Sequence, residues 1–230
     1  MWLTPLVIVL APFFALLLAY FLGIKIRKSI LWGAVVFLVS ISVQQIFQQT
    51  TIVLLNVHEF LRETGTVPME YIPIVSISLG FLAGLCQEGF KFMFSYNRDV
   101  DQAISLGLGF GIVEAAYIAF STLYGSITSQ TPITVNGFLL AVSGLERFLV
   151  TVFHGFATGF MVLSVRKGRW VYGLTSMIIA HGIIDTLAAH YSLTKSFNTL
   201  VLSYVSLVVA NAVLIIFVTK DMRAYKTQIL

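Results

Sequence analysis

The sequence predicts an all-α polytopic membrane protein with seven transmembrane helices, its N-terminus outside and its C-terminus in the cytoplasm. Hydrophobic residues make up 58% of the 230 residues and charged residues only 10%, far from the balance of a soluble domain. Apolar runs of about 20 residues, the length that spans the hydrocarbon, recur throughout. Basic residues are concentrated in alternate loops. We therefore expect a single integral membrane domain over residues 1–230, with its core helices at about 71–190.

The apolar runs predict membrane spans, which we interpret as helices because an isolated span must satisfy its own backbone hydrogen bonds. They fall at residues 3–22, 31–55, 71–95, 102–124, 137–165, 170–190 and 198–219. The first run could mimic a signal peptide, but its basic residues follow the run instead of preceding it, which suits an anchor. Residues 56–70 form the longest polar stretch and are expected to be an outer loop, with room for a short interfacial helix.

The loop charges set the predicted orientation. Ten basic residues lie in the segments 23–29, 96–101, 166–169 and the C-terminal tail, and two lie in the loops between the other span ends. The positive-inside rule then places the first set in the cytoplasm. The formal net charge of +4 follows from this topology and does not indicate a nucleic-acid partner. The expected location is the cell membrane, with the lipid bilayer as surroundings.

Spans three to six carry ionisable residues deep inside. These are Glu88, Glu114, His154, His181 and Asp185. A charge at the bilayer centre is unfavourable by about 2.5–3.5 kcal/mol on insertion scales, so such residues usually mark a functional site. The remaining spans have no acid or base at their centres and are expected to act as scaffold. Cys86 is the only cysteine, which excludes an intramolecular disulfide and a thiolate metal cluster.

Glycines share helix faces with the two glutamates. Gly80, Gly84 and Glu88 follow at four-residue intervals, and Lys91 lies one turn beyond on the same side. Small residues at this spacing let helices approach closely. Two interpretations of Glu88 remain open: an ion pair with Lys91, or a base that polarises a water.

The next span presents a similar face through Gly107, Gly111 and Glu114. A glycine run of this kind resembles a phosphate loop superficially, but no Walker lysine and no preceding strand support a nucleotide site. We interpret it as a packing motif. Glu114 has no basic neighbour in its own helix, so a partner must come from another one, or the carboxyl is protonated.

Span five places His154 before Gly155 and Gly159, another pair of small residues at helical spacing. Glu146 and Arg147 lie toward the outer end of this span. We expect them to support the site by reaching the interface or by pairing across helices.

Span six carries His181 and Asp185 one turn apart on one face. Asp185 either orients the imidazole or serves as a ligand itself. In span two, Gln44 and Gln48 also share a face. They either form interhelical hydrogen bonds or line a polar cavity.

Imidazoles and carboxylates without cysteine suit zinc or another divalent metal. The candidate ligands are His154, His181 and either Glu114 or Asp185. A three-ligand site with an open position would lower the pKa of a bound water toward about 7. The two imidazoles must then lie within about 10 Å, given Zn–N bonds of about 2.0–2.1 Å. Without a metal, Glu88 and the histidines could still catalyse acid–base hydrolysis.

Four blocks of the chain resemble a known superfamily over residues 30–190: QEGFK, GLGFGIVEA, ERFLVTVFHGFATG and AHGIIDTL. Glu88 and Lys91 fall on an E-E-x-x-[RK] motif, and the other blocks place Glu114, His154, His181 and Asp185 on its acids and histidines. The superfamily joins CAAX-protease-like intramembrane peptidases, PrsW-type and YhfC-type metalloproteases, and the APH scaffold subunit of gamma-secretase. The order and spacing of these four blocks most resemble the YhfC-type branch, which is similar to PrsW.

The resemblance implies a hydrolytic site within the membrane, with acids and histidines that activate water. One position departs from the peptidase pattern, because Gln87 stands where those members have their first glutamate, and a glutamine cannot act as a base. The APH scaffold has a similar Q-E-x-x-R block, seven spans and no known proteolysis of its own. However, this chain retains Glu114, which that scaffold lacks.

Our leading hypothesis is an intramembrane metalloprotease-like hydrolase acting on a membrane-embedded or membrane-proximal peptide or protein. Glu88 or Glu114 would activate water, His154 and His181 would bind metal or stabilise the oxyanion, and Lys91 would neutralise charge. The alternative is a non-catalytic scaffold or chaperone for a membrane-protein partner. A small transporter with a proton relay is a third possibility, but the chain lacks an inverted repeat.

Overall fold

The computed structural model describes residues 3–64, 66–128 and 137–227, and this part of the chain is helical with short connections and no strand. The helices are α1 (Leu3–Leu10), α2 (Phe13–Phe21), α3 (Ile30–Leu54), α4 (His58–Thr64), the 3₁₀ turn η1 (Met69–Tyr71), α5 (Ile72–Ser95), α6 (Val100–Thr128), α7 (Gly137–Arg166), α8 (Trp170–Thr194) and α9 (Phe197–Thr227). Seven helical segments in it are long and apolar enough to cross a membrane. The protein is therefore a multi-pass membrane protein, as predicted.

The first predicted span is two helices instead of one. α1 ends at Leu10 and α2 begins at Phe13, with Ala11 and Pro12 between them. Proline lacks the backbone N–H that would continue the ladder, and its ring clashes with the preceding turn. The two helices together still cover a full span and lie against α6 and α7.

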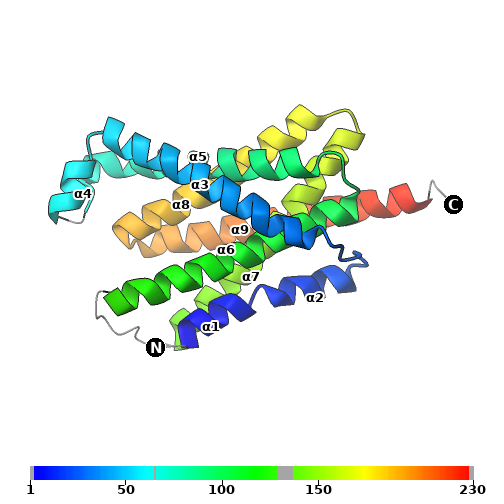
Figure 1. Ribbon diagram of the computed structural model, residues 1–230, viewed down its shortest axis with the longest axis horizontal. Coiled ribbons are helices and arrows are strands. Elements are labelled where there is room, and N and C mark those ends of the chain that lie inside the picture. Colours follow the sequence, from blue (N-terminus) through cyan, green and yellow to red (C-terminus); the bar gives the residue numbers. More distant parts are fainter. Residues whose placement is uncertain (1–2, 65, 129–136, 228–230) are drawn as a thin grey trace.

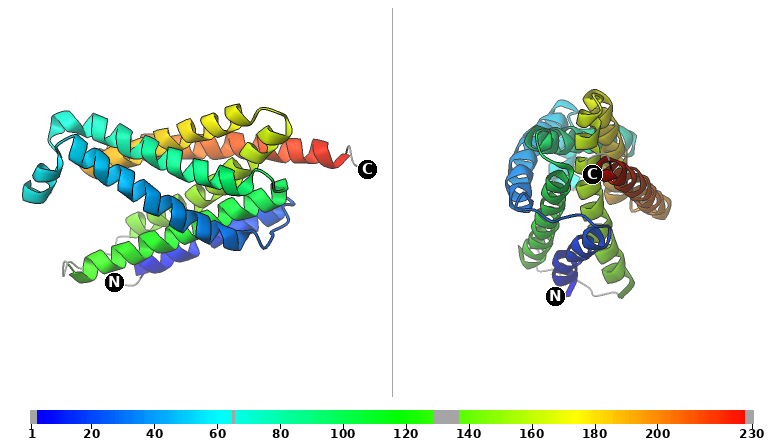
Figure 2. Two further views of the ribbon diagram at one scale, coloured as in Figure 1. Left: turned by 45° about the horizontal axis from the view of Figure 1, so that its top comes forward. Right: turned by 90° about the vertical axis from the view of Figure 1, so that its right-hand side faces the viewer.

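The six long helices form a closed ring. α3 packs against α5, α5 against α8, α8 against α9, α9 against α7, α7 against α6, and α6 returns to α3. Their axes run roughly along the long dimension of the molecule (Figure 1). Toward the end that carries α4, the helices α3 and α5 spread away from α1 and α6 (Figure 2). Near the middle of the ring, the inner faces of α5, α6, α7 and α8 are in contact with one another.

α1 begins and α9 ends toward opposite ends of the long axis, as an odd number of crossings requires (Figure 1). The C-terminal end of α9 shares its end of the molecule with the basic loops. There the Lys25 backbone N–H donates to Asp101, and Lys167 forms an ion pair with Asp221. This grouping agrees with the predicted pattern of loops, while the side of the membrane they face stays a prediction.

Glycines bring α5 and α8 into backbone contact. A Cβ atom on Gly80 would lie 2.3 Å from the Thr186 backbone nitrogen, and one on Gly84 would lie 2.7 Å from the Ile178 carbonyl oxygen. Both distances are far below van der Waals contact, so neither site admits even a methyl group without movement. The predicted glycine face is confirmed, and it sets Glu88, one turn further along α5, directly against α8.

The α6–α7 contact has the same character. A Cβ atom on Gly107 would lie 2.1 Å from the His154 carbonyl oxygen, and one on Gly111 would lie 2.7 Å from the Thr151 Cα. This close approach fixes His154 next to the face of α6 that carries Glu114.

The α5–α8 contact predicts opposite outcomes for two glycines of one helix. Gly80→Ala should lower the melting temperature in mild detergent, because relieving the clash is unfavourable by about 1–3 kcal/mol. Gly89→Ala is the matched control, since its Cβ would have no neighbour within 4 Å; alanine also favours a helix. Equal melting temperatures for the two variants would contradict the described contact.

Candidate functional site

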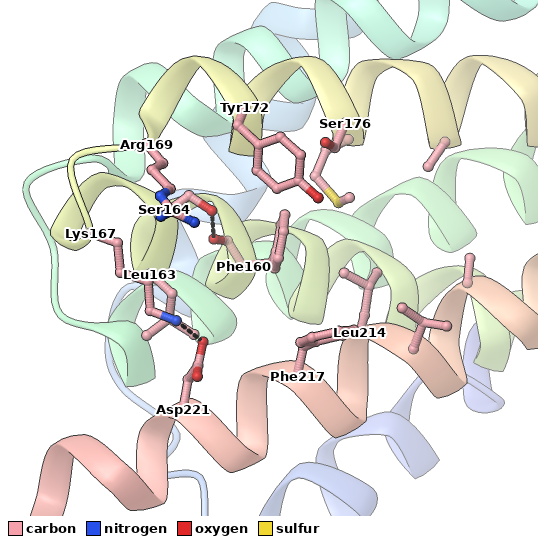
Figure 3. Close-up of a pocket in the computed structure, with 14 residues that line it drawn as sticks. Phe160, Leu163, Ser164, Lys167, Arg169, Tyr172, Ser176, Leu214, Phe217 and Asp221 are labelled. Carbon is pink, nitrogen blue, oxygen red and sulfur yellow. Dashed lines mark hydrogen bonds and ion pairs between the residues drawn. The ribbon is translucent and has the colours of Figure 1, made fainter.

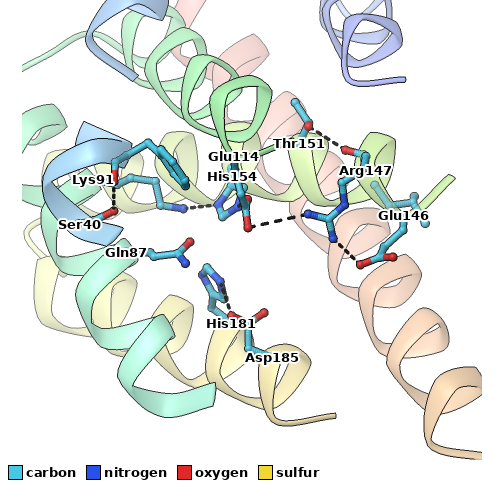
Figure 4. A network of polar contacts seen from close by, with 12 residues as sticks. Ser40, Gln87, Lys91, Glu114, Glu146, Arg147, Thr151, His154, His181 and Asp185 are labelled. Atoms are coloured by element: carbon cyan, nitrogen blue, oxygen red, sulfur yellow. Dashed lines mark hydrogen bonds and ion pairs between the residues drawn. The ribbon is translucent and has the colours of Figure 1, made fainter. Parts of the chain in front are cut away.

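The ionisable residues predicted from the sequence meet inside the helical ring (Figure 4). Glu88 comes from α5, Glu114 from α6, His154 from α7, and the pair His181 and Asp185 from α8. Glu88, His154 and His181 are buried. Each residue reaches the centre because its helix turns a glycine-containing or polar face toward its neighbours.

Glu88 holds the central position. Its Oε1 lies 2.6 Å from the Lys91 Nζ and 2.6 Å from the His181 Nδ1. Both Glu88 and Lys91 side chains are fully buried, so the ion pair considered from the sequence is present. The second carboxylate oxygen, Oε2, is buried without a hydrogen-bond partner among the described residues. That oxygen therefore keeps its capacity to accept a hydrogen bond.

His154 links Lys91, the ion-pair partner of Glu88, to Glu114. Its Nδ1 lies 2.8 Å from the Lys91 Nζ, and its Nε2 lies 2.7 Å from the Glu114 Oε2. A lysine ammonium can only donate, so Nδ1 accepts, and the proton on Nε2 is donated to Glu114. The interhelical partner expected for Glu114 is thus His154.

His181 lies between two carboxylates. Its Nδ1 faces Glu88, and its Nε2 lies 3.4 Å from the Asp185 Oδ2. Asp185 therefore occupies the position of a carboxylate that orients the imidazole, one of its two predicted roles. The ring centroids of His154 and His181 are 5.3 Å apart, well inside the roughly 10 Å limit for a shared metal.

An outer layer of polar groups surrounds Glu114. The Arg147 Nη1 lies 3.9 Å from the Glu114 Oε1, and Arg147 also pairs with Glu146. This confirms pairing across helices for Arg147. The Tyr204 hydroxyl on α9 lies 3.4 Å from the Glu146 Oε2 and donates to the Val142 carbonyl oxygen.

Tyr204 was not predicted from the sequence, because span seven has no acid or base at its centre. The available signal was a phenol within an apolar span, since a buried tyrosine usually finds a polar partner.

One ligand atom from each of Glu88, His154 and His181 could hold a metal ion, and these atoms lie within 4.8 Å of one another. The sequence had suggested Glu114 or Asp185 as the third ligand. In the structure these two acids instead face the outer ring nitrogens, at His154 Nε2 and His181 Nε2. Carboxylates in that position fix the tautomer of metal-binding histidines.

The donor set fits a divalent cation. Two histidines and one glutamate are a known ligand set of catalytic zinc. The site already attracts a cation, because the Lys91 ammonium contacts both Glu88 and His154. A metal held by these residues would therefore compete with Lys91 for Glu88 and His154.

Gln87 does not join this cluster by a hydrogen bond among the described contacts. Its amide nitrogen donates to the Gln44 Oε1 on α3 at 3.0 Å, and its own Oε1 is buried without a partner. Gln48 donates to the Leu79 carbonyl oxygen. The hydrogen bonding predicted for Gln44 and Gln48 is confirmed.

Two cavities adjoin the cluster. One of about 60 Å³ touches Glu114, Arg147, His154, His181, Asp185 and Tyr204. This exceeds the roughly 10–15 Å³ that one water needs, and its walls are polar. A larger groove of about 350 Å³ lies between α3, α5 and α8 and includes Gln44, Gln48 and Ala83. Asp185 lines both, so this side chain lies between the groove and the small cavity.

The sequence profile of the YhfC intramembrane metalloprotease family matches residues 120–207. The chain is similar to this family of proteases. The matched range holds Glu146, Arg147, His154, His181 and Asp185, while Glu88 and Glu114 precede it. No match was found among curated proteins or among solved structures. The YhfC similarity thus covers α7 and α8, and the structure adds the two glutamates that complete the cluster.

The Glu88–Lys91 pair gives a test of the site's geometry. Glu88→Gln alone leaves a buried ammonium without its counter-charge, so it should destabilise the protein by about 3–5 kcal/mol. The double variant Glu88→Gln with Lys91→Met removes both charges and should recover most of this loss. Unfolding free energies of the two single variants and the double variant measure the coupling. Strictly additive losses would show that the two charges do not interact.

Proposed function

We propose that this protein is an intramembrane peptidase that hydrolyses a membrane-embedded or membrane-proximal peptide with a water activated at Glu88, His154 and His181. The observation that carries the proposal is a buried carboxylate oxygen without a partner, Glu88 Oε2, beside two imidazoles that are each oriented by a second carboxylate. The YhfC match supports the same reaction class.

Glu88 would act as the general base. Its Oε2 accepts a proton from the water while the water oxygen attacks the peptide carbonyl carbon. The carbon–nitrogen bond then breaks, and the same proton passes to the leaving nitrogen, giving a carboxylic acid and an amine. Glu114 is less suited to this task, because His154 and Arg147 already engage its two oxygens.

The positively charged groups would stabilise the oxyanion. Lys91 donates toward the centre of the site, and a donor fixed in a water-poor site acts strongly on developing negative charge. Asp185 and Glu114 keep His181 and His154 in fixed orientations. Arg147 and Tyr204 in turn hold Glu146 and Glu114 at the cavity wall.

Glu88, His154 and His181 would also hold the metal that the family name implies. Such an ion would supply Lewis-acid polarisation of the carbonyl and a more acidic water. Zinc and other borderline divalent metals suit these donors.

The groove beside Asp185 is the proposed substrate path. Gln44 and Gln48 lie one helical turn apart on α3 and line this groove. Their amide groups can donate to and accept from an extended peptide backbone. A peptide hydrogen-bonded there would approach the small cavity at Asp185.

Hydrolysis is tested in proteoliposomes with fluorescein-labelled casein and single-span model peptides, with new termini identified by mass spectrometry. Glu88→Gln, His154→Ala and His181→Ala should each abolish cleavage, and Asp185→Asn should lower it about 10–100-fold. His58→Ala is the matched control, because His58 is exposed on α4, outside the cluster. Cleavage that survives Glu88→Gln would contradict the assigned base.

Metal binding gives a second test that does not depend on activity. Because Lys91 contacts Glu88 and His154, Lys91→Met should raise the affinity for Zn²⁺ about tenfold, and His154→Ala or His181→Ala should abolish binding. Titration calorimetry and metal analysis of the purified protein measure both. Equal affinities in the wild type, Lys91→Met and the histidine variants would rule out this metal site.

A membrane scaffold is the second candidate function. Gln87, which hydrogen-bonds Gln44, stands where the related peptidases carry a carboxylate, and this observation favours the scaffold. Purification from native membranes in mild detergent distinguishes the two. A stoichiometric membrane-protein partner, together with no hydrolysis and no Zn²⁺ binding, would replace the peptidase proposal with the scaffold.

A further inference from the structure

A separate cavity of about 460 Å³ lies between α7, α8 and α9, at the end of the molecule that carries the basic loops. Its lining includes none of the clustered acids and histidines described above. Figure 3 shows α8 on one side, α9 on the other, and side chains from both projecting between them.

The inner part of this α8–α9 groove is apolar. Met177, Leu214 and Phe217 line it, and the small side chains of Ala180 and Ala210 leave its width open. The Ser164 hydroxyl also lines the groove, but it already donates to the Phe160 carbonyl oxygen. The Ser176 and Tyr172 hydroxyls line it as well, but most of its lining is apolar and offers van der Waals contact to a hydrocarbon chain.

The mouth of the groove is basic. Lys167 and Arg169 line it, together with Asp221, the ion-pair partner of Lys167. Arg169 is exposed and forms no ion pair with another described residue. α8 begins at Trp170, and no side chain caps it, so its first N–H groups and its dipole add positive potential. Two independent features thus favour an anion at the mouth.

The residues around the mouth are typical of the depth at which lipid headgroups lie. Trp170 and Tyr172 are exposed beside it, and such aromatic residues are enriched where a span meets the interface. Basic pockets between spans at this level recognise anionic lipid headgroups. The apolar inner groove continues from there along α8 and α9, as an acyl chain would.

We propose that the α8–α9 groove binds one anionic phospholipid. Its phosphate contacts Arg169, Lys167 and the start of α8, and one acyl chain packs between α8 and α9. The bound acyl chain stabilises the position of α9, the helix that brings Tyr204 to Glu146. The proposal does not depend on the peptidase function, because it uses a different set of residues.

The test compares thermal stability in phosphatidylcholine nanodiscs with and without phosphatidylglycerol, and counts retained lipids by native mass spectrometry. Wild-type protein should retain one phosphatidylglycerol and melt at a higher temperature when that lipid is present. Arg169→Gln should lower the preference for phosphatidylglycerol over phosphatidylcholine about fivefold, the effect of one basic residue near the surface.

Two further variants separate the phosphate from the acyl chain. Ala210→Phe fills the groove and should abolish lipid retention. If the Ala210→Phe variant does not fold, the Arg169→Gln variant still decides the test. Lys28→Gln is the matched control, an exposed basic residue of another loop at the same end, and should behave as wild type. Equal stabilisation by both lipids, or the same gain from inorganic phosphate in phosphatidylcholine nanodiscs, would overturn the proposal.

Discussion

The buried contact between Glu88 and Lys91 organises the centre of this protein. Glu88 Oε1 accepts from Lys91 and also contacts His181. Lys91 in turn contacts His154, and His154 contacts Glu114. This series of contacts joins four helices: α5, α6, α7 and α8. Leaving either charge unpaired in this position would be strongly unfavourable. This pair lies within α5, whereas the contacts to His181 and His154 cross to α8 and α7 and require those helices to approach α5 closely.

Glycines provide that approach. Gly80 and Gly84 bring the α5 backbone against α8, and Gly107 brings α6 against the His154 carbonyl. Between helices in lipid, packing and hydrogen bonds replace the hydrophobic effect as the driving force. The same contacts that hold the bundle together thus set the distances within the cluster.

The sequence predicted the seven spans because length and apolarity are local properties, and it predicted the clustered residues because ionisable groups are rare at that depth. It did not resolve the break at Pro12 in the first span. It also named Glu114 or Asp185 as the third metal ligand, where the structure places Glu88, because that choice depends on how helices rotate against one another. Tyr204 was missed for the same reason, since its partner Glu146 lies on a different helix.

The central claim is that Glu88, His154 and His181 surround one cation position, beside the Lys91 ammonium. X-ray absorption spectroscopy at the zinc edge of the zinc-loaded Lys91→Met variant tests it directly. The account predicts two imidazole nitrogens at about 2.0–2.1 Å, a carboxylate oxygen at a similar distance, and no sulfur. A shell without histidine, or a Zn–S distance of about 2.3 Å from Cys86, would contradict it.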